Sequence, residues 1–448
     1  MIFSDSEILA RCMVIVSVER LSFSPTATTI DQVNMSNLNT TSTRNIARPG
    51  RIIAILGMLA AFAPMATDMY LAAFDLMRVH FGAKEGEIEL TLSIFFLGLA
   101  FGQAVYGPII DRFGRRVPLL VGIGIYLAST ALFLVAQDLR AFIALRFLQA
   151  VGGSSGMIIG RAIIADMFDE RENARALSLV IAVMTLAPVI APVLGGIVIS
   201  LFGWKSIFLV MLAFGAICAA LTWRYIPETL AKEDRRAESP AKIAGAWYRL
   251  VTKPTFIAPA IVGGLAQGCM FAFITGSPEV FQTIHGATPS RYGLLFATIA
   301  LALVISAHIN RMALKYKTPE FLLGLLLLIN ALAGIGTIIG ASTGNLVLLM
   351  IPLWVAIGSI GFIGANAAAI AMESSTDHAG SGSSLIGIMQ FGVAFLVSTG
   401  VAMSQNGTAY PMTIAIATCG LLANAVWRVS RRGDTASRRA AQIPIGSG

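Results

Sequence analysis

Long apolar runs alternate with short polar connections through most of this chain. Each run approaches the roughly 20 residues that a helix needs to cross the hydrocarbon core of a bilayer. The pattern therefore predicts an all-α polytopic membrane protein with twelve transmembrane helices. We expect the spans near residues 51–73, 89–110, 117–136, 139–165, 174–201, 204–226, 254–276, 291–313, 320–341, 344–372, 383–403 and 409–429.

The longest polar connection divides these spans into two sets of six. Two six-helix bundles joined by a linker and related by an axis along the membrane normal are typical of one large class of transporters. We predict a disordered N-terminal tail over 1–50, which could also precede the true start of the protein. The bundles are expected over 51–226 and 254–430, the linker over 227–253 and a second tail over 431–448.

Basic residues gather in alternate connections, mainly those after the second, fourth, sixth and eighth spans, and in the C-terminal tail. Loops that remain in the cytoplasm are enriched in Lys and Arg. Both chain ends are therefore expected in the cytoplasm.

Composition strengthens the membrane assignment. The chain is 56% hydrophobic and 12% charged, with a mean hydropathy of +0.77, whereas soluble domains are about 25% charged. The net charge of +8 would suit a nucleic-acid partner, but membrane topology already accounts for the basic loops. We therefore expect a lipid bilayer and small molecules as partners, and no nucleic acid.

Asp68 is the leading candidate for chemistry, because it lies within the first predicted span. An ionised carboxylate inside a membrane is costly unless it is paired or faces water, so such acids default to functional hypotheses. Arg146 in the fourth span lies at a similar depth and could pair with Asp68 directly or act through a polar network. The alternatives are an Asp68 that reaches water at the span end and a purely structural Arg146.

The connection after the second span carries a second candidate, a charged hairpin with glycines at both sides. An ion cluster here could hold one of two states of a rocking pair of bundles; the alternative is that its charges only set topology. The predicted gate residues are Gly107, Asp111, Arg112, Gly114, Arg115 and Arg116.

Two further sets complete the candidates. In the fifth span, Pro188 and Pro192 precede Gly195 and Gly196, and small residues let helices approach closely; this predicts a kinked helix between the bundles. Substrate-lining residues are the weakest candidates, since aromatic residues also serve as packing. They are Tyr70, Gln149, Phe271 and Phe273.

Several of these segments together resemble a known family, the major facilitator superfamily. GPIIDRFGRR resembles its loop after the second span, LRFLQAVGG its fourth-span motif and APVIAPVLGG its antiporter motif. More narrowly, TDMYLAAF, PETL, FITGSPEVF and the segment from ANAAAIAM to LIGIMQ are similar to the Bcr/CflA multidrug resistance subfamily.

This resemblance implies proton-coupled efflux (drug:H+ antiport) of compounds such as chloramphenicol or bicyclomycin. It further implies a bacterial inner membrane, alternating access between the bundles, and a proton gradient in place of any cofactor. By the same resemblance Asp68 is the proton site, Arg146 its modulator, and Asp111, Arg112 and Arg116 the cytoplasmic gate.

Two other functions remain open from the residues. Export or import of a native metabolite, such as an amino acid, peptide or sugar, would use the same architecture. A non-transporting membrane protein is less favoured, since no catalytic triad, metal cluster or nucleotide-binding glycine loop stands out. We expect a transporter rather than an enzyme, and a monomer.

Overall fold

The structure is a computed structural model that describes residues 49–235, 239–376 and 379–441. Within these ranges it contains helices, turns and loops but no strand. The tail predicted over 1–50 lies, apart from its last two residues, outside the described residues, as does the end of the C-terminal tail from 442 on.

The elements follow one another as helices with short connections. In chain order they are α2 (Pro49–Ala60), α3 (Phe62–Asp68), η2 (Leu71–Ala73), α4 (Phe74–Phe81), α5 (Glu87–Phe113), α6 (Arg116–Leu132), α7 (Leu139–Met167), α8 (Glu170–Phe202), α9 (Ser206–Tyr225), η3 (Lys232–Asp234), α10 (Pro240–Val251), α11 (Pro254–Pro278), η4 (Glu279–Ile284), α12 (Pro289–Ala313), α13 (Pro319–Ser342), α14 (Leu346–Glu373), α15 (Ala379–Met403) and α16 (Tyr410–Ala441).

Eleven helical segments among the described residues are long and apolar enough to cross a membrane. The one remaining predicted span, the third (117–136), corresponds to α6, an apolar helix that is shorter than the other spans, at 17 residues. The predicted all-α polytopic fold is therefore confirmed, with one span at the lower limit of length for a bilayer.

Turn chemistry in the sequence sets many helix starts. α10, α12 and α13 each begin with a proline that follows a Ser or Thr, and this hydroxyl accepts a backbone N–H of the first turn. Proline suits the first turn because its missing N–H would have no partner inside the helix, and a Ser or Thr cap satisfies one of the free donors.

Two spans extend past their predicted ends. The first was expected to end near residue 73, but its helical path continues through α4 to Phe81. The seventh was expected to end near 276, but α11 passes directly into the π-helical turn η4 and ends at Ile284. Charged residues in these stretches indicated loops; in the structure both stretches are helical, and Arg78 and Glu279 form an ion pair there.

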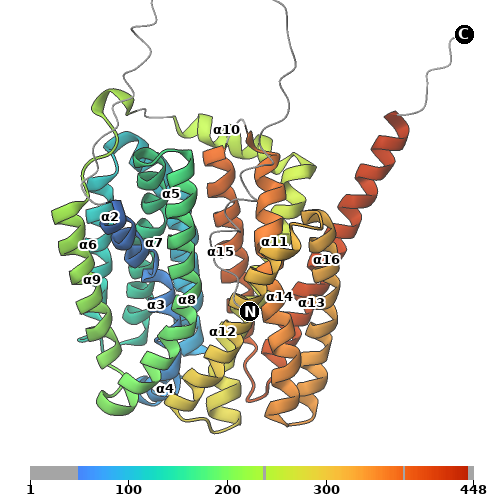
Figure 1. Cartoon of the computed structure of the whole chain (residues 1–448). Coiled ribbons are helices and arrows are strands. Elements are labelled where there is room, and N and C mark those ends of the chain that lie inside the picture. The colour runs from blue at the N-terminus through green and yellow to red at the C-terminus, as the bar shows by residue number, and fades with distance from the viewer. Residues whose placement is uncertain (1–48, 236–238, 377–378, 442–448) are drawn as a thin grey trace, which may run out of the picture. The chain divides into compact units, whose positions relative to one another are not determined.

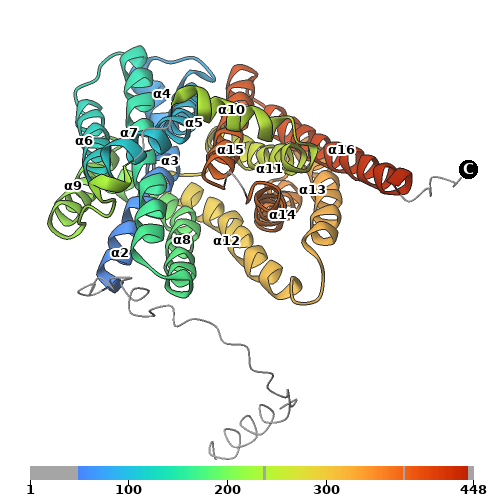
Figure 2. The same cartoon turned by 90° about the horizontal axis from the view of Figure 1, so that it is seen from above.

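The helices form a first half, α2 to α9, and a second half, α11 to α16, which lie side by side in Figures 1 and 2. Helix α5 packs along α15, and α8 packs against α12. We call the end that carries α10 the linker end and the opposite end, where α4 lies, the far end (Figure 1). Contacts of Pro192 with Gly293 and of Gly196 with Pro289 join α8 to α12 at the far end.

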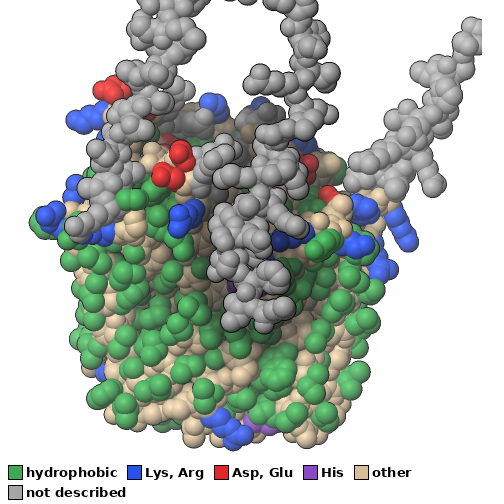
Figure 3. All heavy atoms as spheres, in the orientation of Figure 1, with side chains coloured by type: hydrophobic (Ala, Val, Ile, Leu, Met, Phe, Trp, Pro, Cys, Tyr) green, Lys and Arg blue, Asp and Glu red, His purple; other side chains and the backbone are tan. Residues whose placement is uncertain are grey.

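The surface seen in Figure 3 fits a bilayer environment. Hydrophobic side chains cover the middle of this face, while Lys, Arg, Asp and Glu gather mainly along its upper, linker end. Large apolar residues such as Leu201, Phe202 and Leu332 are more than half exposed. An apolar belt of this kind would be unstable in water, and it confirms a multi-pass membrane protein.

Candidate functional site

Asp68 is the last residue of α3, at the point where the first span changes from α3 to the 3₁₀ turn η2. It is only 2% exposed. The Thr67 hydroxyl lies 3.0 Å from Asp68 Oδ1 and can donate to it, but this hydroxyl also lies 3.0 Å from the Ala63 carbonyl. Among the described residues no ion pair involves Asp68, so it is a buried acid without a cation.

Asp68 lies beside the boundary between the two halves. The carbonyl of the next residue, Met69, approaches Gly195 so closely that a Cβ there would stand 2.2 Å from its oxygen. From the other half, α11 and α12 pack against η2, which begins three residues after Asp68. At 2% exposure, Asp68 does not reach bulk water in this structure.

Arg146 of α7 is fully buried and does not form an ion pair with Asp68. Its Nη1 donates to Gln149 Oε1 at 2.6 Å, and its Nη2 donates to the carbonyl of Ala66 at 3.1 Å. The guanidinium also lies 4.3 Å from the ring centre of Tyr70 and 4.4 Å from that of Phe95. Of the two predicted arrangements, the direct pair is absent; Arg146 reaches the backbone two residues before Asp68.

The residues predicted to line a substrate pocket are all buried here. Tyr70 bonds to Thr91, and Gln149 donates to Thr130 at 2.9 Å, so both belong to the polar network around Arg146. Phe271 packs against Phe96 of the other half, with ring centres 4.1 Å apart and the ring planes tilted by 52°.

Phe273 packs against Phe296 with ring centres 5.0 Å apart. The structure thus places Tyr70 and Gln149 together and both phenylalanines in aromatic packing, and their contact with a substrate stays a prediction.

The predicted hairpin forms a compact ion cluster at the linker end. Arg115 Nη1 is 2.8 Å from Asp111 Oδ1, and Arg115 Nε is 3.0 Å from Asp166 Oδ2 on α7. Arg116 donates to the carbonyl of Trp223 at 2.6 Å, and Arg112 lies over the ring of Phe113. The cluster therefore ties together α5, α6, α7 and α9.

Sequence reasoning missed the acid that organises this hairpin, Glu228 of the PETL segment. Its carboxylate accepts from the backbone N–H groups of Arg115 at 2.8 Å, Leu230 at 3.1 Å and Arg116 at 3.3 Å. Burial opposes ionisation, but these three bonds and the nearby Arg235 outweigh it and lower the pKa of Glu228. We call Asp111, Arg115, Asp166, Glu228 and Arg235 the linker-end cluster.

The hairpin glycines have different roles. Gly114 has φ +88° and ψ −178°, a backbone region that only glycine adopts readily. A Cβ at Gly114 would also stand 2.4 Å from Glu228 Oε2. Gly107, by contrast, has open space where its side chain would be, so the structure gives no packing reason for it.

The predicted glycine pair of the fifth span does allow close approach. Gly195 faces Met69 as described, and a Cβ on Gly196 would stand 2.4 Å from the carbonyl oxygen of Pro289 on α12. Pro188 and Pro192 lie inside α8. The carbonyl of Pro192 meets Gly293, so small residues on both helices create this junction between the halves.

A second buried charge group, which sequence reasoning did not find, lies at the far end. Arg78 Nη2 of α4 is 2.9 Å from Glu89 Oε1 on α5 and 2.8 Å from Glu279 Oε2 on η4. Arg78 Nη1 lies 3.7 Å from Asp75 Oδ1, and Thr283 Oγ1 lies 3.1 Å from the same oxygen. These five residues are the far-end cluster. The sequence feature that could have indicated this cluster is the segment FITGSPEVF, in which the acid Glu279 follows an apolar run.

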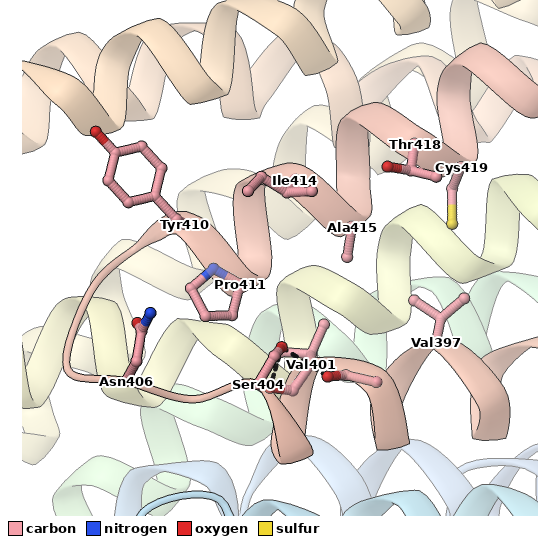
Figure 4. A pocket seen from close by; sticks show the side chains of 11 residues that line it. Val397, Val401, Ser404, Asn406, Tyr410, Pro411, Ile414, Ala415, Thr418 and Cys419 are labelled. Atoms are coloured by element: carbon pink, nitrogen blue, oxygen red, sulfur yellow. Dashed lines mark hydrogen bonds between the residues drawn. The ribbon is translucent and has the colours of Figure 1, made fainter.

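A pocket of about 410 Å³ opens between α15 and α16 (Figure 4). Its mostly apolar lining includes Val397, Val401, Ile414 and Cys419, and Ser404 and Asn406 are among its polar lining residues. None of the predicted substrate residues contributes to it, and its lining comes from the second half alone.

Comparison with known proteins decides the family. The model of the Major Facilitator Superfamily matches residues 56–399, which is most of the chain. The chain belongs to the Major Facilitator Superfamily. It is thus a membrane transporter rather than an enzyme, as the sequence predicted.

Relatives within the superfamily carry drug-resistance names. The Bicyclomycin resistance protein homolog of Haemophilus influenzae is 31% identical over 375 residues, covering 82% of this chain and 92% of that protein. The Chloramphenicol resistance protein of Pseudomonas aeruginosa is 28% identical, covering 72% and 74%. These relatives confirm the resemblance to the Bcr/CflA subfamily.

Solved structures of other superfamily members share the fold. A bacterial homolog of the human lysosomal transporter Spinster, in an inward-facing and occupied conformation, aligns with a TM-score of 0.70 at 17% identity, covering 86% of this chain and 97% of that chain. The nucleoside transporter NupG aligns with a TM-score of 0.69 at 11% identity, covering 85% and 99%. At these identities the likeness concerns the fold alone.

Proposed function

We propose that this chain exports small drug-like compounds in exchange for protons by alternating access between its two halves. The names of its relatives support drug-like substrates, and a bacterial inner membrane is the compartment that they favour. In this proposal the linker end and both chain ends face the cytoplasm, and the far end faces the periplasm. No cofactor beyond the proton gradient takes part.

One observation carries the proposal for proton coupling: Asp68 is buried without a cation at the boundary of the halves. A carboxyl group in such surroundings favours its neutral, protonated form, since burial penalises charge. A site that exchanges a proton for a substrate needs a group whose ionised form is unfavourable in the closed state and solvated in the open state. Asp68 meets both needs when the halves separate.

The cycle follows from this property. With the far end open, a proton from the periplasm binds the Asp68 carboxylate and the compound leaves. After the far end closes and the linker end opens, the proton passes from Asp68 to the cytoplasm, and a new compound binds. Arg146 would keep the first span in place through the Ala66 carbonyl, so it acts as a positioning residue rather than as a partner of the proton.

The test is transport by purified protein in liposomes with and without an imposed pH gradient. A panel of chloramphenicol, bicyclomycin, amino acids, peptides and sugars separates drug efflux from metabolite transport. We expect accumulation of a drug that depends on the gradient, and its loss in Asp68→Asn. Transport of metabolites alone, or drug transport that ignores the gradient, would contradict the proposal.

The matched control is Asp138→Asn. Asp138 is exposed and caps the start of α7 by accepting from the Ala141 N–H at 3.3 Å. Asparagine caps helices as well as aspartate does, so this variant removes an acid of the same half without removing its structural role. It should transport like the unchanged protein.

A further inference from the structure

The far-end cluster holds more negative than positive charge in a buried place. Glu89 is 0% and Glu279 is 1% exposed, and both bind the same nitrogen of Arg78. Their other oxygens, Glu89 Oε2 and Glu279 Oε1, are buried without a hydrogen-bond partner among the described residues. One guanidinium therefore neutralises only one of two buried carboxylates, and the second would be a buried charge without a partner.

The remaining acid of the cluster does not change this count. The side chain of Asp75 is 39% exposed, so water can solvate it. Thr283 has a single hydroxyl proton, which it can donate to Asp75 at 3.1 Å or to Glu279 at 3.3 Å, and it brings no charge.

Among the described residues, no cation other than Arg78 forms an ion pair with Asp75, Glu89 or Glu279. Tyr70 bonds to Thr91 of α5, and a tyrosine phenol carries no charge at ordinary pH. From α11 and α15, Thr275 and Ser398 form a hydroxyl chain with Ser93, 2.7 Å apart at each step. On the exposed turn before α5, Lys84 donates its backbone N–H to Glu87.

On the side of the second half, Gln282 of η4 donates to the carbonyl of Leu71 at 3.2 Å, and Tyr292 of α12 bonds to Ser277. Both groups are uncharged. Within the described surroundings, the second negative charge of Glu89 and Glu279 can therefore be neutralised only by a bound proton.

The cluster also crosses the boundary between the halves. Arg78 and Glu89 belong to the first half, whereas Glu279 and Thr283 belong to the second, about 200 positions further along the chain. Separation of the halves at the far end would break the Arg78–Glu279 pair and bring water to both glutamates. Solvated glutamates release their protons near neutral pH.

We propose that Glu89 and Glu279 form a second proton-binding site, which binds one proton when the halves close at the far end and releases it when they open. The proposal rests on the alternating access of the proposed function. Because this proton arrives from and returns to the same side, it does not cross the membrane. It sets how the external pH biases closure, and it leaves the number of transported protons unchanged.

The test measures closure rather than transport. Spin labels on Val135→Cys, between α6 and α7, and on Val347→Cys, at the start of α14, report the separation of the two halves at the far end. Both positions are more than 60% exposed, and the three described native cysteines are buried; Cys12 is replaced by Ser. All variants carry Asp68→Asn, so that the first proton site does not titrate.

Linkage fixes the sign and the size of the response. If closure takes up one proton, the ratio of closed to open molecules falls by up to about tenfold for each unit by which the pH rises. We expect this response between about pH 5 and pH 8 in the Asp68→Asn background. A closed fraction that does not change with pH would overturn the proposal.

Single and double substitutions give opposite expected results. Glu89→Gln or Glu279→Gln leaves one carboxylate for one guanidinium, so each variant should close without a proton, and its closed fraction should stay high and independent of pH. Glu89→Gln combined with Glu279→Gln leaves Arg78 buried without either glutamate and should open the far end. A cluster that only fills space would show no such reversal.

Asp75→Asn is the matched control, because it removes an exposed acid of the same cluster and should keep the pH response. If Glu89→Gln fails to fold, Glu279→Gln makes the same test from the other half. A single variant that retains the full pH response contradicts the proposal. The outcome is independent of the proposed function: Asp68→Asn blocks gradient-driven transport whether or not closure responds to pH.

Discussion

The two ends of this transporter each hold a charge cluster, and the two clusters differ in what they connect. At the linker end, Arg115 joins Asp111 and Asp166, and Glu228 binds the hairpin backbone, all within the first half and the linker. At the far end, Arg78 joins a glutamate of each half. The first cluster can persist while the halves move, whereas the second must break when the far end opens.

Exposure separates the clusters as well. The side chain of Asp111 is 52% exposed, so water screens its pair with Arg115, and such pairs are worth at most about 1 kcal/mol. The far-end glutamates are sealed from water. This difference indicates that the linker-end cluster stabilises one half, whereas the far-end cluster forms only when the two halves are closed at that end.

The largest effect is expected from Arg78→Ala. It leaves two buried glutamates without a cation, and removal of one partner of a buried pair costs about 3–5 kcal/mol. The midpoint of unfolding in detergent should fall strongly at pH 8 and less at pH 5, where the glutamates can take up protons.

Arg140→Ala is the control for Arg78→Ala, since Arg140 is an exposed arginine in the first turn of α7. Equal unfolding midpoints for the Arg78 and Arg140 variants would remove the distinction between a buried cluster and a surface charge.

Gly114→Ala should have an intermediate effect at the linker end. Alanine is strained at φ +88°, ψ −178°, and its Cβ would press on the Glu228 carboxylate 2.4 Å away; strain of this kind costs about 1–3 kcal/mol. Unfolding should occur at lower temperature, while the far-end spin-label distance stays unchanged.

Gly107→Ala is the natural comparison, because open space surrounds that glycine. It should unfold like the unchanged protein. If Gly114→Ala opened the far end, the two clusters would be coupled, which would contradict their separate roles.

The smallest effect is expected from Glu228→Gln, and it should depend on pH. The pKa of Glu228 is lowered in the folded protein from the ordinary 4.5, because three backbone N–H groups and Arg235 outweigh the cost of burial. A lowered pKa stabilises the fold above the unfolded value, and this contribution is lost as the pH falls through the folded value.

The difference in free energy of unfolding between the unchanged protein and Glu228→Gln should therefore be constant above about pH 5 and shrink below it. Its size should be about 1 kcal/mol, since the glutamine oxygen still accepts hydrogen bonds. A difference that grows toward acid pH would contradict the assigned role of Glu228.

The sequence predicted the features that lie close together along the chain. Apolar runs of helical length predicted the spans, and the contiguous hairpin predicted an ion cluster, to which the Asp111–Arg115 pair belongs. Asp68 could be found because an acid inside an apolar run is rare in itself. Its burial at the boundary of the halves is consistent with the predicted site, and its role remains a proposal.

The features that sequence reasoning missed depend on distant residues. Glu279 marked the end of a span by its charge, and only the fold brings it to Arg78 about 200 positions earlier. The same holds for Glu228, which is 113 positions from Arg115. Arg146 was expected either to pair with Asp68 directly or to act through a polar network. Only the fold shows that the Ala66 carbonyl accepts from Arg146.

Two activities of Asp68→Asn in liposomes show most directly whether Asp68 carries the transported proton. One is accumulation of a drug driven by a pH gradient; the other is exchange of labelled for unlabelled drug without a gradient. If Asp68 carries the transported proton, the variant loses accumulation but keeps exchange, while Asp138→Asn keeps both. Accumulation at the unchanged rate in Asp68→Asn would contradict the account.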